Sequence, residues 1–243
     1  MHRFYLPTLD DLALTGAEAH HATHVLRLKT GDELTVFDGR GHAVACRIAE
    51  ARRDRIRLTA LQHSHSPPLR CRITLAQAIP KKNMEFIVQK ATELGVSAIV
   101  PLISERTVAR PTEASHKLDR WREIALESCK QCGNNWLPVI LPPQQFAEFV
   151  QVPQHVELTL IAALHPDARP LKTILAEAPA LPHATTPRIL VMIGPEGDFT
   201  PAEYDLARVA SAQPLSLGSL VMRADTAALY TLSILHHELQ VAS

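Results

Sequence analysis

The sequence predicts an α/β protein, in which a mostly parallel sheet with helices follows a small β-rich domain. Regularly spaced apolar–polar alternation dominates the first part of the chain, and strands alternate with helices from residue 71 onward. Between them lies "HSHSPP" (63–68), which ends in two prolines that neither a helix nor a central strand accepts. We therefore expect two domains, residues 1–68 and residues 71–243.

The first domain is predicted from three alternating segments. "DELTVFD", "HAVACRIAEA" and "RIRLTAL" alternate apolar and polar residues, and the turn signals "DGRG" (38–41) and "RRD" separate them. Short strands at this spacing favour a small β-barrel or sandwich.

The second domain is predicted from strands and helices in turn. "RITLAQAI" and "SAIVPLIS" are expected strands, and the helix between them has Gly95 as its C-terminal stop. Its apolar face is Met84, Ile87, Val88, Ala91 and Leu94, and the face of the next helix is Leu118, Trp121, Ala125 and Cys129.

Later segments extend this pattern. "VELTLIAAL" and "RILVMIG" are typical of strands buried on both faces. "TPAE" (200–203) has the residues of a capping box with proline at the first helical position. "PLSLG" is an expected strand, and "DTAALYTLSILHHEL" an expected helix. This alternation predicts a mostly parallel sheet.

Composition restricts the classes of protein. Hydrophobic residues make up 46% and charged residues 21%, as in globular chains. The net charge is zero, which counts mildly against nucleic-acid binding, although arginines gather in residues 46–57, where solvated hairpin ends are an equal explanation. There is no membrane-length apolar stretch and no secretory leader, and the four cysteines indicate a reducing cytosol. No metal is expected, because "CKQC" (129–132) lacks a second ligand pair and both its cysteines read as buried thiols.

Two buried strands end in glycine, at Gly194 and Gly218. One strand–helix–strand unit separates them, so parallel neighbouring strands would bring both ends to one edge of the sheet. Ligands of open α/β sheets bind beyond the carboxyl ends of strands, and charged residues follow both glycines. The two turns therefore indicate one site.

The motifs "IGPEGDFTPAE" and "LSLGSLVMRADTAAL" closely resemble the last two motifs of the SPOUT methyltransferases. "HATHVLRLKTGDELTVFDG", "NMEFIVQKATELGV", "SERTV", "QCG" and "ALHP" extend the resemblance to the family that methylates N3 of a uridine in 16S ribosomal RNA of the small subunit. The resemblance implies a C-terminal trefoil knot, a PUA-like β-barrel that binds RNA, a homodimer and a cytoplasmic protein.

S-adenosylmethionine is the cofactor that the resemblance implies, and no metal is needed with this methyl donor. Gly194 and Gly197 are expected to leave room for a bent cofactor, while Pro195 stiffens the turn. The implied cofactor-binding residues are Leu164, His165, Gly194, Pro195, Glu196, Gly197, Leu217, Gly218, Val221, Met222, Arg223 and Thr226.

The implied chemistry needs a uracil N3 that has lost its proton. We expect Arg223 to stabilise the uracil oxygen or position the base, and Asp225 or Glu196 to assist proton removal. A helix N-cap before "TAAL" is an equal explanation of Asp225, which stands where the family usually has glutamate. Asp198-Phe199 replaces the family's more common glycine-containing pair.

RNA phosphates are expected to meet basic residues of both domains. The candidates are Arg3, Arg27, Arg52, Arg53, Arg55, Lys81 and Lys82. Two alternatives stay open: the same chemistry on another RNA, and a non-catalytic RNA-binding factor of ribosome assembly.

Overall fold

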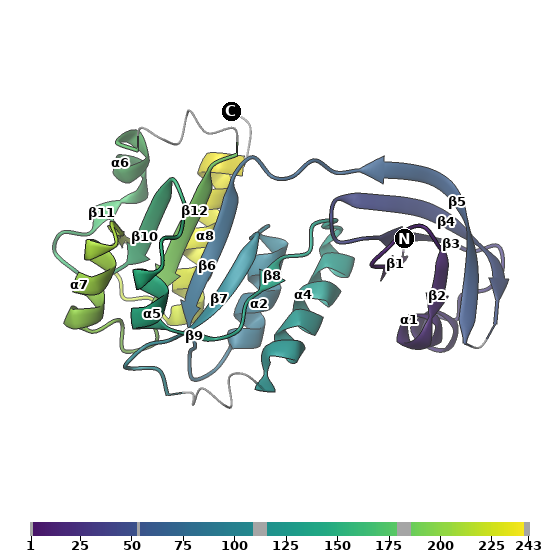
Figure 1. Ribbon diagram of the computed structural model, residues 1–243, viewed down its shortest axis with the longest axis horizontal. Helices are drawn as coiled ribbons and strands as arrows, with labels where there is room; N and C mark the ends of the chain where they lie inside the picture. The colour runs from purple at the N-terminus through teal and green to yellow at the C-terminus, as the bar shows by residue number, and fades with distance from the viewer. Residues whose placement is uncertain (1, 53, 109–115, 179–185, 241–243) are drawn as a thin grey trace. The chain divides into compact units, whose positions relative to one another are not determined.

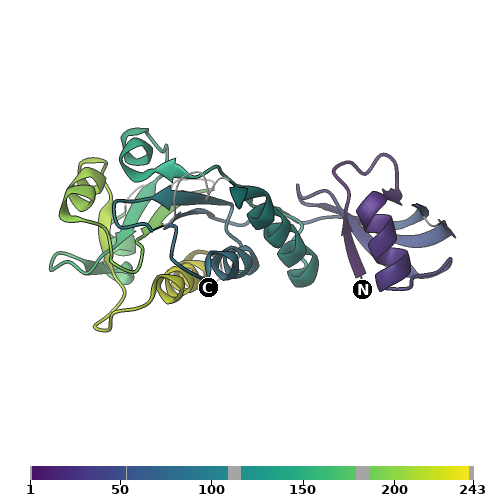
Figure 2. The ribbon, with the colours of Figure 1, turned by 90° about the horizontal axis from the view of Figure 1, so that it is seen from below.

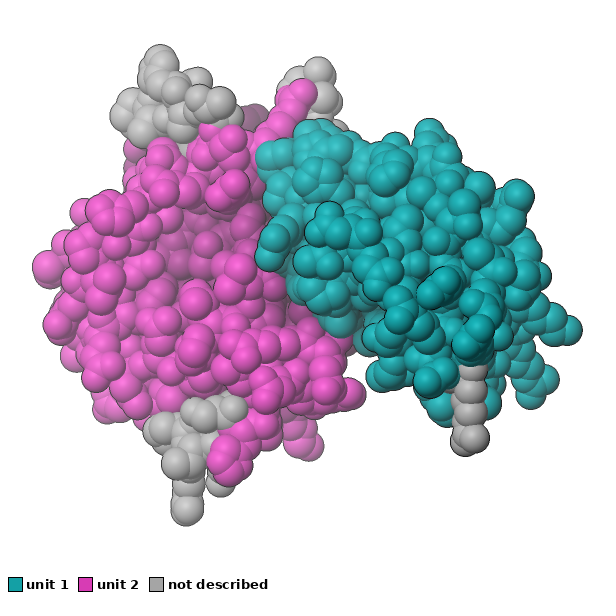
Figure 3. Space-filling model, turned by 45° about the vertical axis from the view of Figure 1, so that its right-hand side comes forward, with its two compact units in different colours: residues 1–68, 126–137 teal, residues 69–125, 138–243 magenta. Residues whose placement is uncertain are grey.

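The computed structural model describes residues 2–52, 54–108, 116–178 and 186–240 (Figure 1). The chain divides into two compact units, residues 1–68 with 126–137 and residues 69–125 with 138–243, which Figure 3 colours separately. Helix α4, Leu118–Cys132, contributes residues to both units. Nothing in the sequence pattern predicts that residues 126–137 join the first unit.

The first unit contains one five-stranded sheet in the order β1-β3-β4-β5-β2. β1 runs parallel to β3, and the other pairings are antiparallel. A short helix, α1, and a π-helical turn, η1, lie between β2 and β3. The bounds are β1 His2–Tyr5, β2 Ala13–Thr15, α1 Gly16–His20, η1 His21–Val25, β3 Glu33–Phe37, β4 His42–Ala51 and β5 Arg55–His65.

Alternating side chains of this sheet form the core of the first unit, as the sequence predicts. The buried cluster joins the inward residues of the strands to two alanines of α1 and η1: Phe4, Leu14, Ala19, Ala22, Leu34, Val36, Val44, Cys46, Ile48, Ile56 and Leu58. β5 continues through the polar run "HSHS" to His65, which pairs with His42 of β4, and both of its histidines are exposed. Tertiary pairing here overrides the weak strand preference of the polar residues.

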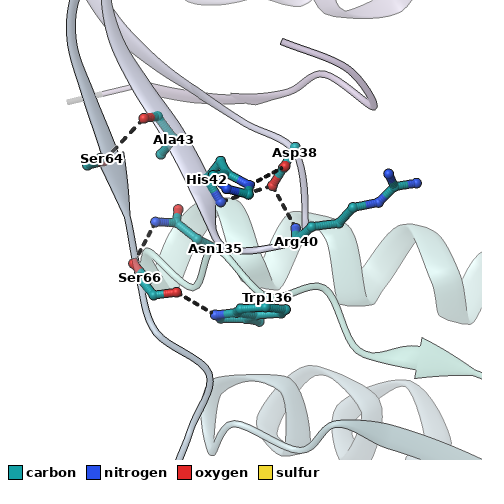
Figure 4. A network of polar contacts seen from close by, with 8 residues as sticks. All are labelled: Asp38, Arg40, His42, Ala43, Ser64, Ser66, Asn135 and Trp136. Atoms are coloured by element: carbon teal, nitrogen blue, oxygen red, sulfur yellow. Dashed lines mark hydrogen bonds and ion pairs between the residues drawn. The ribbon is translucent and has the colours of Figure 1, made fainter.

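Trp136 closes the first unit against the end of β5. Its indole Nε1 donates to the carbonyl oxygens of Ser66, at 3.0 Å, and Pro67, at 3.2 Å. Asn135 Nδ2 donates to Ser66 Oγ at 2.9 Å, and the Asn135 carbonyl accepts from the Gly41 amide at 3.0 Å. Figure 4 shows these side chains beside the turn between β3 and β4. Hydrogen bonds to Ser66, Pro67 and Gly41 therefore hold residues 135–136 in the first unit.

The second unit contains an eight-stranded sheet in the order β11-β13-β10-β12-β6-β7-β8, with β9 paired to β7. Every strand pairing described in it is parallel, as predicted. The bounds are β6 Arg72–Ala78, β7 Ala98–Ile103, β8 Val139–Ile140, β9 Gln144–Gln145, β10 Leu158–Ala162, β11 Arg169–Pro170, β12 Arg188–Ile193 and β13 Gln213–Ser216.

The prediction that the two glycine-ended strands are neighbours is wrong. β10 lies between β12 and β13 and pairs with both. The connection from β12 to β13 passes over one strand, and local apolar patterns carry no information on strand order. Because all three strands are parallel, their carboxyl ends still meet at one edge of the sheet.

Helices cover the two faces of this sheet, with α2 and α8 on one side and α5 and α7 on the other (Figure 2). The helices are α2 Met84–Glu93, α5 Phe146–Gln151, α6 Leu171–Ala176, α7 Pro201–Val209 and α8 Ala224–Gln240. The face toward α5 and α7 buries one cluster that includes Ala76, Ala78, Val100, Leu102, Phe146, Phe149, Leu190, Met192, Phe199, Tyr204 and Ala207.

The helix signals read from the sequence are confirmed at α2 and α7. α2 buries Met84, Ile87, Val88 and Ala91, and Gly95 follows it at a φ of 76°. The predicted capping box is present at α7, with Thr200 as N-cap, proline at the start and Glu203 closing the reciprocal bond. Within the described residues, no helix combines the length and apolar character needed to cross a membrane.

Gly41→Ala is expected to destabilise the first unit through a steric clash. A Cβ at Gly41 would lie 2.7 Å from Trp136 Cζ2 and 2.9 Å from the Ser66 carbonyl oxygen, at a φ of +99°. The matched control is Gly31→Ala, because Gly31 has a φ of +97° but no heavy atom within 4 Å of the added Cβ. The steric part should cost about 1–3 kcal/mol beyond the control in urea unfolding followed by tryptophan fluorescence. Equal losses in the two variants would contradict the packing described for Trp136.

Candidate functional site

A cavity lies at the sheet edge where β10, β12 and β13 end. The segment after each strand lines it, and the first turns of α8 complete it. The space free of atoms amounts to about 590 Å³, including solvent at its mouth. The turns at Gly194 and Gly218 therefore face a common space that side chains do not fill.

Most of the predicted cofactor residues line this cavity. They are Leu164, Gly194, Pro195, Glu196, Leu217, Gly218, Val221 and Met222. His165, Gly197, Arg223 and Thr226 are not among its lining residues. Sequence reasoning missed six lining residues at the ends of β10 and β12 and in the first turn of α8: Ala162, Ala163, Ile193, Asp198, Ala224 and Ala227.

The turn after β12 is built from tight backbone contacts. The Asp198 amide donates to the Pro195 carbonyl at 2.9 Å, and a Cβ at Gly194 would lie 3.2 Å from Asp198 Cα and 3.2 Å from the Phe199 nitrogen. Glycine at 194 therefore lets the turn fold back on itself. Gly194 also lines the cavity, and the expectation that it leaves room for a cofactor stays a prediction.

Gly197 also has a different neighbour from the one expected. A Cβ there would lie 3.2 Å from Cδ of Arg106, and the Arg106 guanidinium donates to the Gly197 carbonyl. The Glu105 amide beside it donates to Glu203 Oε1 at 2.7 Å. The segment "SERTV" therefore supports this turn. In the sequence, only the resemblance of "SERTV" to a family motif indicated that Arg106 could matter.

The charge of the cavity identifies the kind of ligand that it fits. Apart from Glu196 and Asp198, its lining residues are apolar or small, and none of them is lysine, arginine or histidine. Two carboxylates without a cation disfavour a phosphate and favour a ligand with an apolar body and a positive charge. S-adenosylmethionine, with an adenosine and a sulfonium, is a ligand of this kind.

A second hollow adjoins the cavity and is rich in charge. Lys81, Lys82, Arg223, Glu196 and Asp225 line it together with Pro80, Asn83 and Ala224. Glu196 and Ala224 line both spaces, so the hollow and the cavity share a wall. The predicted catalytic residues and the two predicted lysines therefore lie in one place.

Hydrogen bonds fix the two carboxylates of this hollow. Glu196 Oε1 accepts from the Lys81 amide at 3.0 Å. Asp225 Oδ2 accepts from Asn83 Nδ2 at 2.8 Å, and its Oδ1 accepts from the Thr226 amide at 2.9 Å. The bond from Asn83, with smaller contributions from Thr226 and nearby Arg223, lowers the pKa of Asp225 below its ordinary value.

Asp225 does not occupy the N-cap that the alternative explanation required. α8 begins at Ala224, and the Arg223 carbonyl accepts the first helical bond, from the Ala227 amide at 2.8 Å. Asp225 therefore lies within the first turn, and its side chain links α8 to Asn83. Sequence reasoning missed Asn83, because an asparagine before a helix reads as a cap.

His165 belongs to a polar cluster outside the cavity lining. Its Nδ1 contacts Asp167, which also accepts from the Tyr204 hydroxyl at 3.1 Å and pairs with Arg208 at 2.8 Å. The His165 ring stacks on the Tyr204 ring with centroids 4.8 Å apart. Burial, together with the bond to Asp167, raises the pKa of Tyr204. This cluster anchors the segment after β10 to α7.

The predicted RNA-binding residues differ in solvent exposure and in whether they form ion pairs. Arg27, Arg52, Arg55, Lys81 and Lys82 are exposed, although Arg52 pairs with Glu50 at 2.6 Å and Arg55 with Asp11 at 3.0 Å. Arg53 lies outside the described residues.

Arg3 is engaged inside the first unit. Its guanidinium donates to Asn135 Oδ1 and lies 5.0 Å from the centroid of the Phe37 ring, and burial lowers its pKa. These contacts engage the Arg3 guanidinium within the first unit, so it is not free to bind an RNA phosphate.

The described residues contain no group of three or more histidine, cysteine or acidic side chains that could hold a metal ion. Cys129 is buried, and its pKa is raised to about 12. Cys132 is exposed, so the expectation that both cysteines of "CKQC" are buried is wrong at that position. Cys132 is the last residue of α4.

Comparison with known proteins agrees with this geometry. The family model described as RNA methyltransferase domain matches residues 67–236, and the one described as RNA methyltransferase PUA domain matches residues 14–61. The chain is 34% identical to ribosomal RNA small subunit methyltransferase E of Synechocystis, over 89% of this chain and 69% of that protein.

Solved structures are similar over nearly the whole chain. Ribosomal RNA small subunit methyltransferase E from Neisseria gonorrhoeae, bound to S-adenosyl methionine, has a TM-score of 0.84 and 32% identity, and the match covers 98% of each chain. A methyltransferase from Legionella pneumophila in complex with the bound cofactor SAM has a TM-score of 0.85 and 31% identity, over 97% of each chain. The chain therefore belongs to the RNA methyltransferase family, as its motifs predict, and carries that family's PUA domain before the methyltransferase domain.

Proposed function

We propose that this protein transfers a methyl group from S-adenosylmethionine to N3 of a uridine in the ribosomal RNA of the small subunit. The observation that carries the proposal is the shared wall between the two spaces. A cavity that fits a cationic methyl donor adjoins a hollow lined by Lys81, Lys82 and Arg223, which suits an anionic nucleotide. The names of the similar proteins support the substrate.

In this proposal the cavity residues hold the cofactor, which supplies an electrophilic methyl group when bound. The strand ends offer backbone groups and small residues to its adenosine, and the two carboxylates favour its sulfonium. The protein then needs no metal for this step, since the donor is already activated.

Arg223 is proposed to stabilise the uracil anion. At neutral pH the N3 of uracil carries a proton, and the negative charge that develops when it leaves is spread onto the neighbouring oxygens. Arg223 is exposed, lines the hollow and is held at the N-terminus of α8, where the helix dipole also favours negative charge. A flipped-out base is required, because pairing would occupy N3.

Glu196 is the better placed of the two candidate proton acceptors. It lines both spaces, so its carboxylate lies where the uracil and the methyl donor meet. Asp225 is hydrogen-bonded to Asn83, and its lowered pKa makes it a weaker base. We therefore assign Asp225 to positioning: it ties α8 to Asn83 and keeps Arg223 near the hollow.

The proposal also includes the homodimer, the trefoil knot and the cytoplasmic location that the sequence resemblance implies. Support for the dimer comes from Leu220 and Val221, which line the cavity yet are 78% and 76% exposed. A partner subunit would cover these side chains and enclose the cofactor. Arg27, Arg52 and Arg55 are the proposed phosphate contacts of the first unit, and Lys81 and Lys82 those of the second.

Mapping of modified nucleotides tests the substrate. Ribosomal RNA from cells with and without the protein is compared for N3-methyluridine. We expect one such nucleotide of the small subunit to disappear with the protein and to return when the wild-type chain is supplied. Loss of the modification only from transfer RNA or the large subunit would support the alternative substrate. An unchanged map, with cofactor binding absent, would support the non-catalytic assembly factor.

Arg223→Ala is expected to abolish turnover and to leave cofactor affinity within about tenfold, a difference of roughly 1.4 kcal/mol. The reason is that Arg223 lines the hollow and not the cofactor cavity. Turnover is measured with RNA in vitro and affinity by calorimetry with S-adenosylmethionine. Arg122→Ala is the control, because Arg122 is exposed on α4 and lines neither space. Full activity of Arg223→Ala would remove this residue from the proposed role.

A further inference from the structure

Asp198 has a backbone conformation that most residues avoid. Its φ is 61°, in the left-handed region, which glycine adopts freely, asparagine and aspartate tolerate, and other residues adopt only with strain. Its own side chain compensates locally, because Oδ1 accepts from the Phe199 amide at 2.8 Å. Oδ2 lies 3.4 Å from the Leu164 amide, across the gap between the segments that follow β12 and β10. The turn therefore fixes this carboxylate at the cavity wall.

The carboxylate of Asp198 has no ion-pair partner among the described residues. It lines only the cofactor cavity, where the lining residues include no basic side chain. Glu196, the other carboxylate there, is exposed and also lines the hollow, which contains the basic side chains of Lys81, Lys82 and Arg223. Asp198 is half-buried, so solvent screens it less than it screens Glu196. It is therefore the main uncompensated charge that the protein presents to a ligand in the cavity.

We propose that Asp198 determines the charge specificity of the cavity, favouring S-adenosylmethionine over the demethylated product S-adenosylhomocysteine. This inference rests on the proposed function. The two ligands share the adenosine, the ammonium and the carboxylate, and differ in the sulfonium charge. In methyl transfer the electron pair of uracil N3, whose proton passes to Glu196 in the proposed function, forms a bond to the methyl carbon. The sulfur–carbon bond breaks, its electron pair stays on sulfur, and a neutral thioether results. The attraction of Asp198 for the sulfur is lost at that point, which favours release of the product.

The competing explanation is that Asp198 serves only the turn. Asparagine separates the two roles, since it has nearly the same shape, tolerates a positive φ and keeps an Oδ1 acceptor for the Phe199 amide. Asp198→Asn therefore removes the charge and keeps the bond to the Phe199 amide, and it gives up only the long 3.4 Å contact of Oδ2 with the Leu164 amide. Asp198→Gly removes charge and side chain at a φ that glycine adopts freely, and serves as a second variant should the first fail to fold.

The test is calorimetric binding of S-adenosylmethionine and S-adenosylhomocysteine to the full chain, with Asp205→Asn as the control. Asp205 is an exposed carboxylate on α7 that does not line the cavity. For Asp198→Asn we expect S-adenosylmethionine to bind about fivefold or more weakly, as loss of one partly screened charge pair predicts, and S-adenosylhomocysteine to change by less than about twofold. In the wild type, added salt should reduce the preference for S-adenosylmethionine. The control should bind both ligands as the wild type does.

Equal weakening of both ligands in Asp198→Asn would overturn the inference and leave Asp198 with the turn alone. Unchanged binding of both ligands would also overturn it. A wild-type chain that binds neither ligand would contradict the proposed function itself, so this result is distinguishable from a failure confined to Asp198.

Discussion

The parallel pairing of β10 with both β12 and β13 is the constraint on which the site depends. Hydrogen bonding sets Ile161 beside Met192 on one side and Ala162 beside Leu215 on the other. Three chain segments consequently leave the sheet at the same level and on the same edge. The segments that follow the three strands line one space, whose walls are mostly apolar or small residues. Ligand binding beyond the carboxyl ends of parallel strands is a general property of such sheets.

A chain with no net charge can still present two different electrostatic environments. The cavity contains carboxylates and no basic side chain, whereas the hollow beside it brings two lysines and an arginine together. The boundary between them is Glu196, whose side chain is held by the Lys81 amide. A cationic donor and an anionic acceptor are thereby favoured on opposite sides of one residue. Local arrangement, and not overall charge, makes the site suitable for methyl transfer to RNA.

The sequence predicted the features that depend on neighbouring residues. The capping box at Thr200 and the apolar face of α2 each depend on residues that lie within a few positions of one another in the sequence. Strand order was not predictable, since apolar strands buried on both faces look alike wherever they pair. The hydrogen bond between Asn83 and Asp225 joins positions 142 residues apart, and no local sequence pattern predicts it. The site segments themselves came from motif resemblance, and their geometry shows why glycine stands at position 194: the turn folds back against it.

A crystal structure of the chain grown with S-adenosylmethionine tests the central claim most directly. The account predicts ligand density at the carboxyl edge of the sheet, enclosed by residues 162–164, 193–196, 198, 217–218 and 220–222, with the sulfur on the side toward Glu196 and the hollow. Density for the cofactor at any other place would contradict the account.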